Sequence, residues 1–477
     1  MGLNRKLFFA SRQLLRGTMF DVSGRRTLIK YDSVIRPKHI TELTSDLGMH
    51  VGRNPSYKGG IAALQAVSTK MPKQEELPSR TMRDSYDEVV LPLASSTDYQ
   101  KSHVGARGMV RYGKILEDMD VFAVWLCYRH IHYPNLSFGV PMPVSVVTAL
   151  VDNIHGGHIN LTTEHDLKLR GHVSWVGKTS LECSMELSLL VGNVCKTLLD
   201  AKFVMVAKKA GSAESAFVNK LTPDGPEEQA IFDRGIENIK RRKDFQDKGI
   251  MKVPPTDEER VILHNLFLED FDPKTYILRS GQCPKGAIFM DDAKLTNVII
   301  CQPESENLYS KVFGGFLMRS AFELAWATAY IMSGRRPWIY HTDDIWFRRP
   351  VDVGSLLHYE AQAVYTEANF LQMSVSATVI HAEQGTKEIT NVYYEAQAVY
   401  TEANFLQMSV SATLIHAEQG TKEITNVFHF TFKLDGEDPA PRVIPRTYPE
   451  TLMYIEGRRY MKLACIADKE RAPPASG

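Results

Sequence analysis

The sequence lacks paired cysteines, long hydrophobic runs and a net charge, and each absence excludes a class of protein. Its six cysteines are scattered and none forms a CxxC pair, so neither a zinc ribbon nor a disulfide framework is indicated. No apolar run approaches the roughly 18 residues of a membrane-spanning helix. Lysine plus arginine and aspartate plus glutamate number 56 each, which gives no overall attraction to nucleic acid or anionic lipid. We therefore expect no nucleic-acid partner, no membrane span and a reducing compartment.

The first twenty residues have no acidic side chain, because the first one in the chain is Asp21. Four basic residues alternate there with leucine and phenylalanine. A stretch that is rich in arginine, poor in acids and amphipathic is typical of a mitochondrial transit peptide. The alternative is a disordered basic tail. We expect residues 1–40 to be a transit peptide and the mature protein to lie in the mitochondrial matrix.

The 477 residues, 44% of them hydrophobic, are enough for two domains with proper cores. A helix candidate followed by alternating, strand-like segments occurs twice, which predicts one domain at residues 84–209 and another at 290–437. The helix candidates run from Gly113 to His130 and from Gly314 to Met332. Residues 210–275 are charged and helical in pattern, which indicates a structured connector. Ordered sequence is predicted to begin at Glu88.

The second domain contains a tandem repeat, at residues 359–427. Tyr359–Val392 and Tyr394–Val427 differ only in Val379 against Leu414. Near-identity indicates a recent duplication or an assembly error, because structural repeats diverge in sequence while they keep their pattern. Each copy alternates as a strand does, so the two copies compete for one place in the sheet.

Each helix candidate carries one carboxylate in an apolar setting, Asp120 in the first and Glu323 in the second. Burying a carboxylate is costly, so such a group is a candidate base or nucleophile; a salt-bridged or capping acid is the plainer alternative. Gly314 and Gly315 open the second helix. A glycine pair lets a ligand approach the first-turn N–H groups, which favour negative charge.

Other motifs are weaker. The segment 171–179 resembles a phosphate loop but has five residues between its glycines where four are required, and its alternation indicates a strand. His130 and His132 have no evident third ligand, so no metal is expected. The absence of a GxSxG motif argues against a serine hydrolase. Arg348 and Arg349 are either phosphate-binding residues or solvated surface charges.

The pattern of Asn307, six residues, Gly314 and Gly315 before a buried helix resembles the hotdog acyl-coenzyme A thioesterases. More specific stretches are RYGKILEDMD, GHVSWVGKTS, DAKFVMVA, FGGFLMR, ELAWATA, DDIWF, PVDVGSLL and TNVFHFTF. In this order they are similar to the mitochondrial acyl-coenzyme A thioesterase 9 family, from about Arg83 to Tyr454. The resemblance therefore covers most of the chain.

The resemblance implies an α+β chain of two hotdog domains, each an antiparallel sheet wrapped around a central helix. It implies a hydrolase that converts fatty acyl-coenzyme A to free fatty acid and coenzyme A in the matrix, without a cofactor. The partners it implies are the acyl-coenzyme A substrate and further copies of the chain in a homo-oligomer. The alternatives are a non-catalytic acyl-coenzyme A-binding or regulatory protein and a hotdog enoyl-thioester hydratase.

In related two-domain thioesterases, an asparagine before one helix and an aspartate within the other are catalytic, and the matching residues here are Asn307 and Asp120. The reciprocal pair would be an asparagine before the first helix and an aspartate within the second. The asparagine is missing, since Ala106 stands in the place that corresponds to Asn307. Phe322, eight residues after Gly314, precedes Glu323. The resemblance therefore implies one composite site, with Glu323 as a second-ranked candidate.

The chemistry expected at this composite site is addition of water to a thioester carbonyl. The Gly315 N–H, with help from Asn307, would stabilise the developing oxyanion. Asp120 would activate the water or attack the carbonyl directly.

Overall fold

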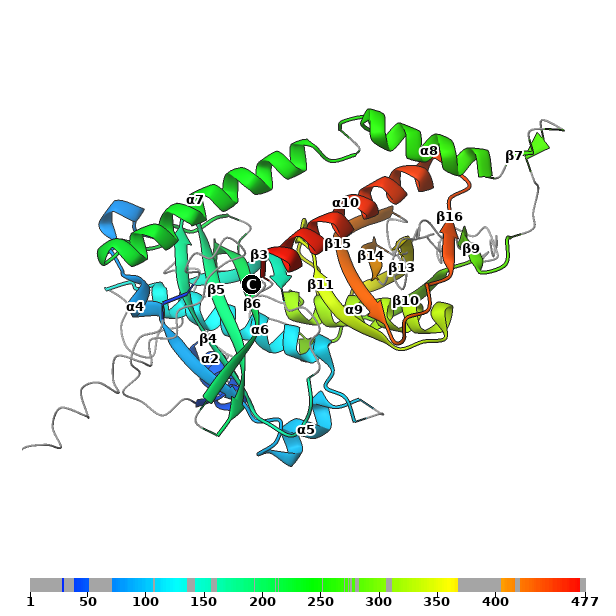
Figure 1. The fold of residues 1–477 in the computed structure, drawn as a ribbon. Coiled ribbons are helices and arrows are strands. Elements are labelled where there is room, and N and C mark those ends of the chain that lie inside the picture. Colours follow the sequence, from blue (N-terminus) through cyan, green and yellow to red (C-terminus); the bar gives the residue numbers. More distant parts are fainter. Residues whose placement is uncertain are drawn as a thin grey trace, which may run out of the picture.

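The computed structural model (Figure 1) describes residues 28–29, 38–50, 71–105, 108–134, 142–155, 161–192, 194–210, 212, 214–250, 252–269, 271–272, 274, 277–278, 283–305, 311–367, 405–416 and 421–471. Its helices are α2 Ile40–His50, α4 Met82–Ser85, α5 Thr97–His103, α6 Tyr112–His130, α7 Gly225–Asp247, α8 Asp257–Glu269, α9 Gly314–Ser333 and α10 Tyr448–Arg471, with short 3-10 helices at Gln74–Glu76 and Pro303–Ser305. None of these helices has both the length and the apolar character needed to cross a bilayer.

One twelve-stranded sheet forms the centre of the molecule, and its two halves repeat the same strand order. The first half has the order β2-β4-β5-β6-β3, with β1 beyond β2, and the second half has the order β10-β13-β14-β15-β11. The strands of the first half are β1 Lys38–His39, β2 Asp87–Leu91, β3 Val144–His155, β4 Leu167–Val176, β5 Ser180–Val191 and β6 Val194–Lys209. Those of the second are β10 Lys294–Ile300, β11 Pro337–Thr342, β12 Ile345–Phe347, β13 Leu356–Glu367, β14 Phe405–His416 and β15 Thr421–Leu434.

The two halves join where β3 pairs antiparallel with β11 and β12. Two small sheets lie apart from the main one, formed by β7 Phe271–Asp272 with β8 Ile277–Leu278 and by β9 Ala287–Asp291 with β16 Arg442–Ile444. The segment 171–179, which resembles a phosphate loop, includes the second half of β4, in agreement with the strand prediction.

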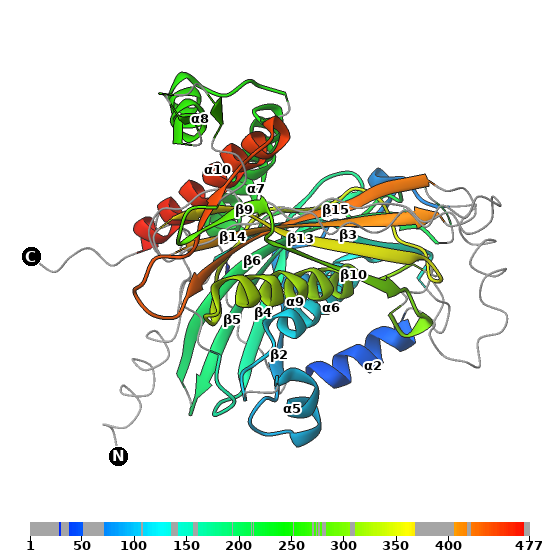
Figure 2. The ribbon, with the colours of Figure 1, turned by 90° about the vertical axis from the view of Figure 1, so that its right-hand side faces the viewer.

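The two predicted long helices are confirmed as α6 and α9, and they lie side by side against one face of the sheet (Figure 2). α9 is apolar almost all round, and most residues of α6 are buried, which suits helices enclosed by a sheet and by each other. The C-terminus of α9 is capped by Gly334, which has a φ of +64°. Each half is therefore an antiparallel sheet wrapped around a central helix, and the predicted α+β hotdog class is confirmed.

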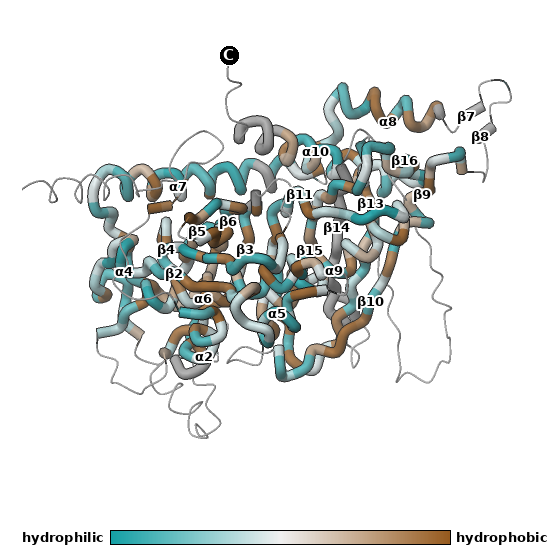
Figure 3. Tube along the Cα trace, turned by 60° about the horizontal axis from the view of Figure 1, so that its bottom comes forward, coloured by the Kyte–Doolittle hydropathy of each residue, from teal (hydrophilic) through white to brown (hydrophobic). Residues whose placement is uncertain are grey.

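The opposite face of the sheet is covered by α7 and α10 (Figure 2). Much of α7 is hydrophilic (Figure 3), and it meets the sheet through ion pairs. Arg242 lies 2.8 Å from the buried Asp152 of β3 and also pairs with Glu182 of β5, while Arg241 lies 2.9 Å from Asp152. The charged, helical pattern of residues 210–275 is thus explained: its arginines neutralise acids on the outer face of the sheet.

Helix α8 begins with a capping box. The Thr256 N–H donates to the Glu259 carboxylate at 2.8 Å, and the Glu259 N–H donates to the Thr256 hydroxyl at 3.3 Å. These two bonds form a capping box, which satisfies N–H groups that have no partner within the helix.

The prediction that ordered sequence begins at Glu88 is wrong. Helix α2 buries Ile40, Leu43 and Leu47 in the main core, and Leu28 is 1% exposed. The prediction was wrong because residues 54–84 are polar, which gave no indication that the residues before them contact the core.

The duplicated segment divides its two copies between neighbouring strands. β13 contains the beginning of the first copy, whereas β14 and the first half of β15 come from the second copy. The strands pair from Leu356 with Ile415 to Glu367 with Phe405. The described residues thus contain the strands of one complete copy, and residues 368–404 lie outside them.

Candidate active site

Asp120 lies in the middle of α6, where α6 packs against the first turn of α9. Its side chain is buried, and its two carboxylate oxygens have different partners. Oδ2 accepts a hydrogen bond from the Gly315 N–H at 2.7 Å, and Oδ1 accepts one from the Thr148 hydroxyl of β3 at 2.5 Å. The fold therefore brings the carboxylate of the first half and the glycine pair of the second half into direct contact.

Gly315 is required by the close approach of the two helices, and Gly314 is tightly packed against Thr148 and Asp120. A Cβ atom on Gly315 would lie 2.9 Å from the Glu117 Cα and 3.0 Å from the Asp120 Cβ. A Cβ atom on Gly314 would lie 3.1 Å from the Thr148 Oγ1 and 3.3 Å from the Asp120 Oδ2. The Gly314 N–H has no acceptor within the described part of the chain, so it is available to a ligand.

Burial raises the pKa of Asp120 from 3.8 to about 6, against the lowering effect of the hydrogen bonds from Thr148 and Gly315. The nearby Glu117 carboxylate adds to the rise. The group is therefore still ionised at neutral pH, but it is a stronger base than an exposed aspartate. A base whose pKa lies close to the working pH is well suited to accept a proton from water.

A cavity of about 570 Å³ adjoins this contact and is lined by Thr148 and Gly314. Five basic residues also line it, which gives it a positive charge: Lys208, Lys209, Lys311, Arg348 and Arg349. Lys209 and Lys311 form ion pairs with Glu214 and Asp352. Asn307, the predicted partner of Asp120, lies outside the described residues.

The two long helices are related by an approximate repeat. A Cβ atom on Gly315 would lie 2.9 Å from the Cα of Glu117, and a Cβ atom on Gly113 would lie 3.3 Å from the Cα of Arg319. Glu117 stands four residues after Gly113, and Arg319 stands four residues after Gly315. Gly113 and Gly315 are therefore equivalent positions.

By the same equivalence, Phe322 takes in α9 the position that Asp120 has in α6. Glu323 lies one residue further and points to a different partner. Its carboxylate pairs with Arg111 at the start of α6 and lies 3.7 Å from Arg319, and its side chain is 37% exposed. Glu323 is thus a half-exposed, ion-paired acid, as the plainer alternative from the sequence had it.

Thr148 was not among the residues singled out from the sequence. Its only signal was a hydroxyl within the apolar strand VSVVTALV, which cannot be told from an ordinary strand threonine without the position of α6. His130 is buried, and its Nε2 lies 2.9 Å from the Asn219 carbonyl oxygen. Among the described residues, no group of three or more His, Cys, Asp or Glu side chains could hold a metal ion.

No family model matches the chain. The chain is 40% identical over 430 residues to "Acyl-coenzyme A thioesterase 9, mitochondrial" of Bos taurus, with 89% of each chain covered. It is 39% identical over 428 residues to the Homo sapiens protein of the same name, with 88% of each chain covered. It is 31% identical over 334 residues to "Acyl-coenzyme A thioesterase 2, chloroplastic" of Humulus lupulus, covering 68% of this chain and 74% of that one.

Among solved structures, an apo hexameric acyl-CoA thioesterase is 20% identical with a TM-score of 0.29, covering 35% of this chain and 97% of that one. The 12:0-ACP thioesterase from Umbellularia californica is 9% identical with a TM-score of 0.39, covering 74% of this chain and 98% of that one. The full-length sequence relatives are the ones that decide the family. With 40% identity over 89% of its length, the chain belongs to the mitochondrial acyl-coenzyme A thioesterase 9 family.

Proposed function

We propose that this chain hydrolyses acyl-coenzyme A thioesters in mitochondria, at a composite site formed by Asp120 and the N-terminus of α9. The observation that carries the site is the buried Asp120 carboxylate, hydrogen-bonded to the Gly315 N–H across the two halves. The family relationship supports the reaction itself, because the relatives are named as acyl-coenzyme A thioesterases.

The reaction consumes one water molecule. Asp120 accepts a proton from the water while the water oxygen bonds to the thioester carbon and the carbonyl electron pair moves onto oxygen. When the tetrahedral intermediate collapses, the carbon–sulfur bond breaks and the proton passes to the leaving thiolate. The products are a carboxylic acid and coenzyme A. Thr148 and the Gly315 N–H hold the carboxylate in position during these steps.

The role expected of the Gly315 N–H changes in this mechanism. Because this N–H donates to Asp120, it orients the base rather than the oxyanion. The Gly314 N–H, together with the Asn307 amide, is the better candidate for the oxyanion. One such donor is worth roughly 3–4 kcal/mol in the transition state.

The basic residues of the adjoining cavity support binding of coenzyme A. Its phosphates carry several negative charges, and Arg348 and Arg349 line the same cavity as Thr148 and Gly314. Arginine and lysine are the side chains that bind phosphate groups most often. We propose that these two arginines contact the coenzyme A phosphates, which was one of two readings of the sequence.

Glu323 has a structural role in this proposal. It pairs with Arg111 and lies one position beyond the place equivalent to Asp120, which Phe322 occupies. The second helix therefore offers no carboxylate to a thioester bound at the start of α6. One catalytic site per chain follows.

The matrix is the compartment we propose, on the basic, acid-poor first twenty residues and the mitochondrial names of the relatives. The Ile29 N–H donates to His172 at 3.3 Å, so a removed transit peptide would end before Leu28 and not at residue 40.

We also propose a homo-oligomer. It is supported by β10, which lies at an end of the described sheet and exposes Val298 and Ile300, each 54% exposed.

The test is release of free thiol from a panel of acyl-coenzyme A substrates of different chain length. We expect Asp120→Asn to lower kcat by roughly 10²–10⁴-fold and Asn307→Ala by roughly 10²–10³-fold. Asp98→Asn, an exposed acid of α5, is the matched control and should leave kcat unchanged. Near-normal turnover of both site variants with intact folding would contradict the mechanism. Hydration without thiol release would indicate a hydratase, and binding without either reaction a non-catalytic protein.

A further inference from the structure

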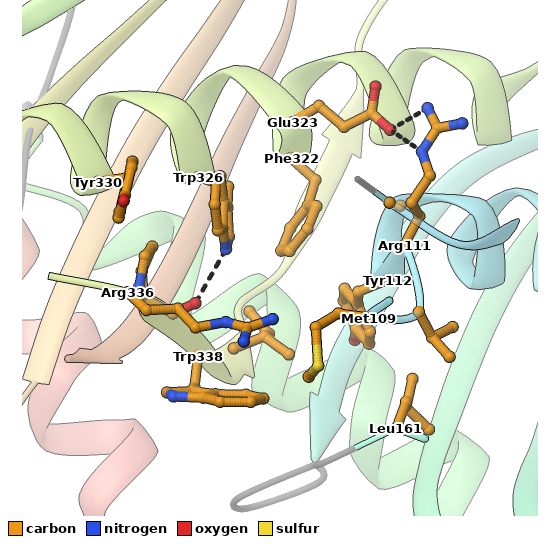
Figure 4. A pocket seen from close by; sticks show the side chains of 15 residues that line it. Met109, Arg111, Tyr112, Leu161, Phe322, Glu323, Trp326, Tyr330, Arg336 and Trp338 are labelled. Atoms are coloured by element: carbon orange, nitrogen blue, oxygen red, sulfur yellow. Dashed lines mark hydrogen bonds and ion pairs between the residues drawn. The ribbon is translucent and has the colours of Figure 1, made fainter. Parts of the chain in front are cut away.

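A second cavity, of about 410 Å³, lies at the start of α6 (Figure 4). Tyr112 and Gly113 line it, and Tyr112 takes in α6 the position that Gly314, which lines the first cavity, has in α9. Its lining is mainly apolar and aromatic and includes Met109, Tyr112, Leu161, Trp326, Tyr330 and Trp338. The volume lies within the roughly 300–1,000 Å³ that small-molecule sites have.

This cavity lacks the group that would make it a hydrolytic site. Phe322 lies where the equivalent position of α6 has Asp120, and its ring packs 5.0 Å from that of Tyr112 and 5.5 Å from that of Phe430. A ring held on two sides by other rings fills the place of the base and excludes water. A ligand in this cavity would therefore be bound without being hydrolysed.

One cation in the lining has no acidic partner among the residues that the structure describes. The Arg336 guanidinium lies 4.3 Å from the centre of the Trp338 ring, and within the described part of the chain no carboxylate forms an ion pair with it. Figure 4 shows its side chain extending over Trp338 into the cavity. The other arginine of the lining, Arg111, is paired with Glu323. A half-buried, unpaired guanidinium stacked on an indole is well placed to bind one carboxylate.

The two indoles beside Arg336 are held in fixed orientations. Trp326 Nε1 donates to the Pro337 carbonyl at 2.9 Å, and Trp338 Nε1 donates to Asp435 at 2.6 Å. The indole of Trp326 also stacks on Tyr330, with ring centres 5.4 Å apart. The apolar wall is thus formed before a ligand arrives, which lowers the entropic cost of binding.

The charges of the two cavities differ in a way that selects the ligand. The first is lined by five basic residues, which suits the several phosphate charges of coenzyme A. The second is lined by two, Arg111 and Arg336, and Arg111 is paired with Glu323. We propose that the second cavity is a non-catalytic binding site for a free fatty acid, with the carboxylate at Arg336 and the chain against Trp326 and Tyr330. The product class of the hydrolase would then bind to the same chain at a second place.

The experiment uses the full chain and decanoate brominated at its last carbon, because bromine quenches the fluorescence of a tryptophan that it touches. The chain has five tryptophans, and two of them line this cavity. We expect saturable quenching that is lost in the Trp326→Phe/Trp338→Phe double variant and kept in Trp175→Phe. Arg336→Gln should raise the half-saturating concentration roughly tenfold or more, since it removes a charge-assisted bond. Arg260→Gln on α8 is the control for loss of a positive charge.

Four results would overturn the proposal. They are quenching that persists in the double tryptophan variant, an unchanged half-saturation in Arg336→Gln, equal binding of bromodecanol, and displacement of the ligand by coenzyme A alone. The last would place the ligand in the first cavity. Circular dichroism and thermal melting check the fold of each variant, and Arg336→Gln keeps the test valid if the double variant does not fold. No turnover is measured, so the outcome does not depend on the hydrolytic mechanism.

Discussion

Replacing Asp120 by asparagine should stabilise the protein at neutral pH while it stops turnover. Burial raises the pKa of Asp120 from 3.8 to about 6, so the folded state disfavours the ionised form. A tenfold change in an acid constant is worth about 1.4 kcal/mol, and the difference therefore costs the native state about 3 kcal/mol above pH 6. Asparagine removes this cost and keeps the contacts. Its carbonyl can accept the Gly315 N–H, and its amide can donate to the Thr148 hydroxyl, which rotates freely.

The sign of the pH dependence follows from the two pKa values. Since the folded value lies above the unfolded one, the native state binds more protons between about pH 4 and pH 6, and wild-type stability falls as pH rises through that window. The variant does not titrate there. Its advantage should be smallest near pH 4 and should reach about 3 kcal/mol above pH 6. Thermal and urea unfolding of both proteins between about pH 5 and pH 8 measure the difference.

Asp118→Asn is the matched control, because it makes the same substitution on the same helix. The Asp118 carboxylate accepts hydrogen bonds from the Tyr99 hydroxyl and from His103, at 2.9 Å for the latter. Asparagine leaves these donors less well satisfied, so this variant should be destabilised by about 1–3 kcal/mol. A lower melting temperature of Asp120→Asn at pH 7.5, or a gain that does not change with pH, would refute the reasoning.

Three further outcomes follow from the same contacts. The logarithm of kcat/KM should rise with a slope of one up to about pH 6 and level off above it, because ionised Asp120 is the base; a flat profile from pH 5 to pH 8 would contradict this. Gly315→Ala should lower stability by about 1–3 kcal/mol and reduce kcat, since its Cβ atom meets the Glu117 backbone at 2.9 Å; Gly105→Ala, with its nearest atom at 3.7 Å, should be neutral in thermal melting. Glu323→Gln should cost less than about 1 kcal/mol in unfolding and change kcat by less than about twofold, as expected for a half-exposed ion pair; a hundredfold loss would make Glu323 catalytic.

The sequence predicts best those features that depend on a single helix or strand. Helices α6 and α9 and several strands of each half follow from local periodicity, and the end of α9 follows from a glycine at the residue after it. Asp120 could be selected because a carboxylate in an apolar helix is rare. Its partner could not be selected in the same way. The bond from the Gly315 N–H joins residues 195 positions apart, and only the packing of the two helices shows that this N–H holds the base.

The second cavity had no signal in the sequence. Trp326 lies within α9, Arg336 in the turn after it and Trp338 in β11, and each suits its own element without reference to the others. The loss of a second catalytic pair could be predicted from the sequence, because Phe322 and Ala106 stand where an aspartate and an asparagine would be needed. The apolar cavity beside Arg336 could not be predicted, since it depends on how two tryptophans and an arginine from separate elements pack together.

The duplicated segment gives the sharpest test of how one copy is used. Glu367 pairs with Phe405 across β13 and β14, and 37 residues lie between them in the chain. Deleting residues 368–402 restores a single copy and leaves Ala403 and Asn404 as a two-residue connection in the same register. We expect a folded, active protein whose stability rises by at most roughly 2–3 kcal/mol, the loop-closure entropy for that shortening. Thermal melting and thiol release against the full chain measure it. Loss of folding or activity would mean that the additional copy is needed, and that the pairing of β13 with β14 does not define the second half by itself.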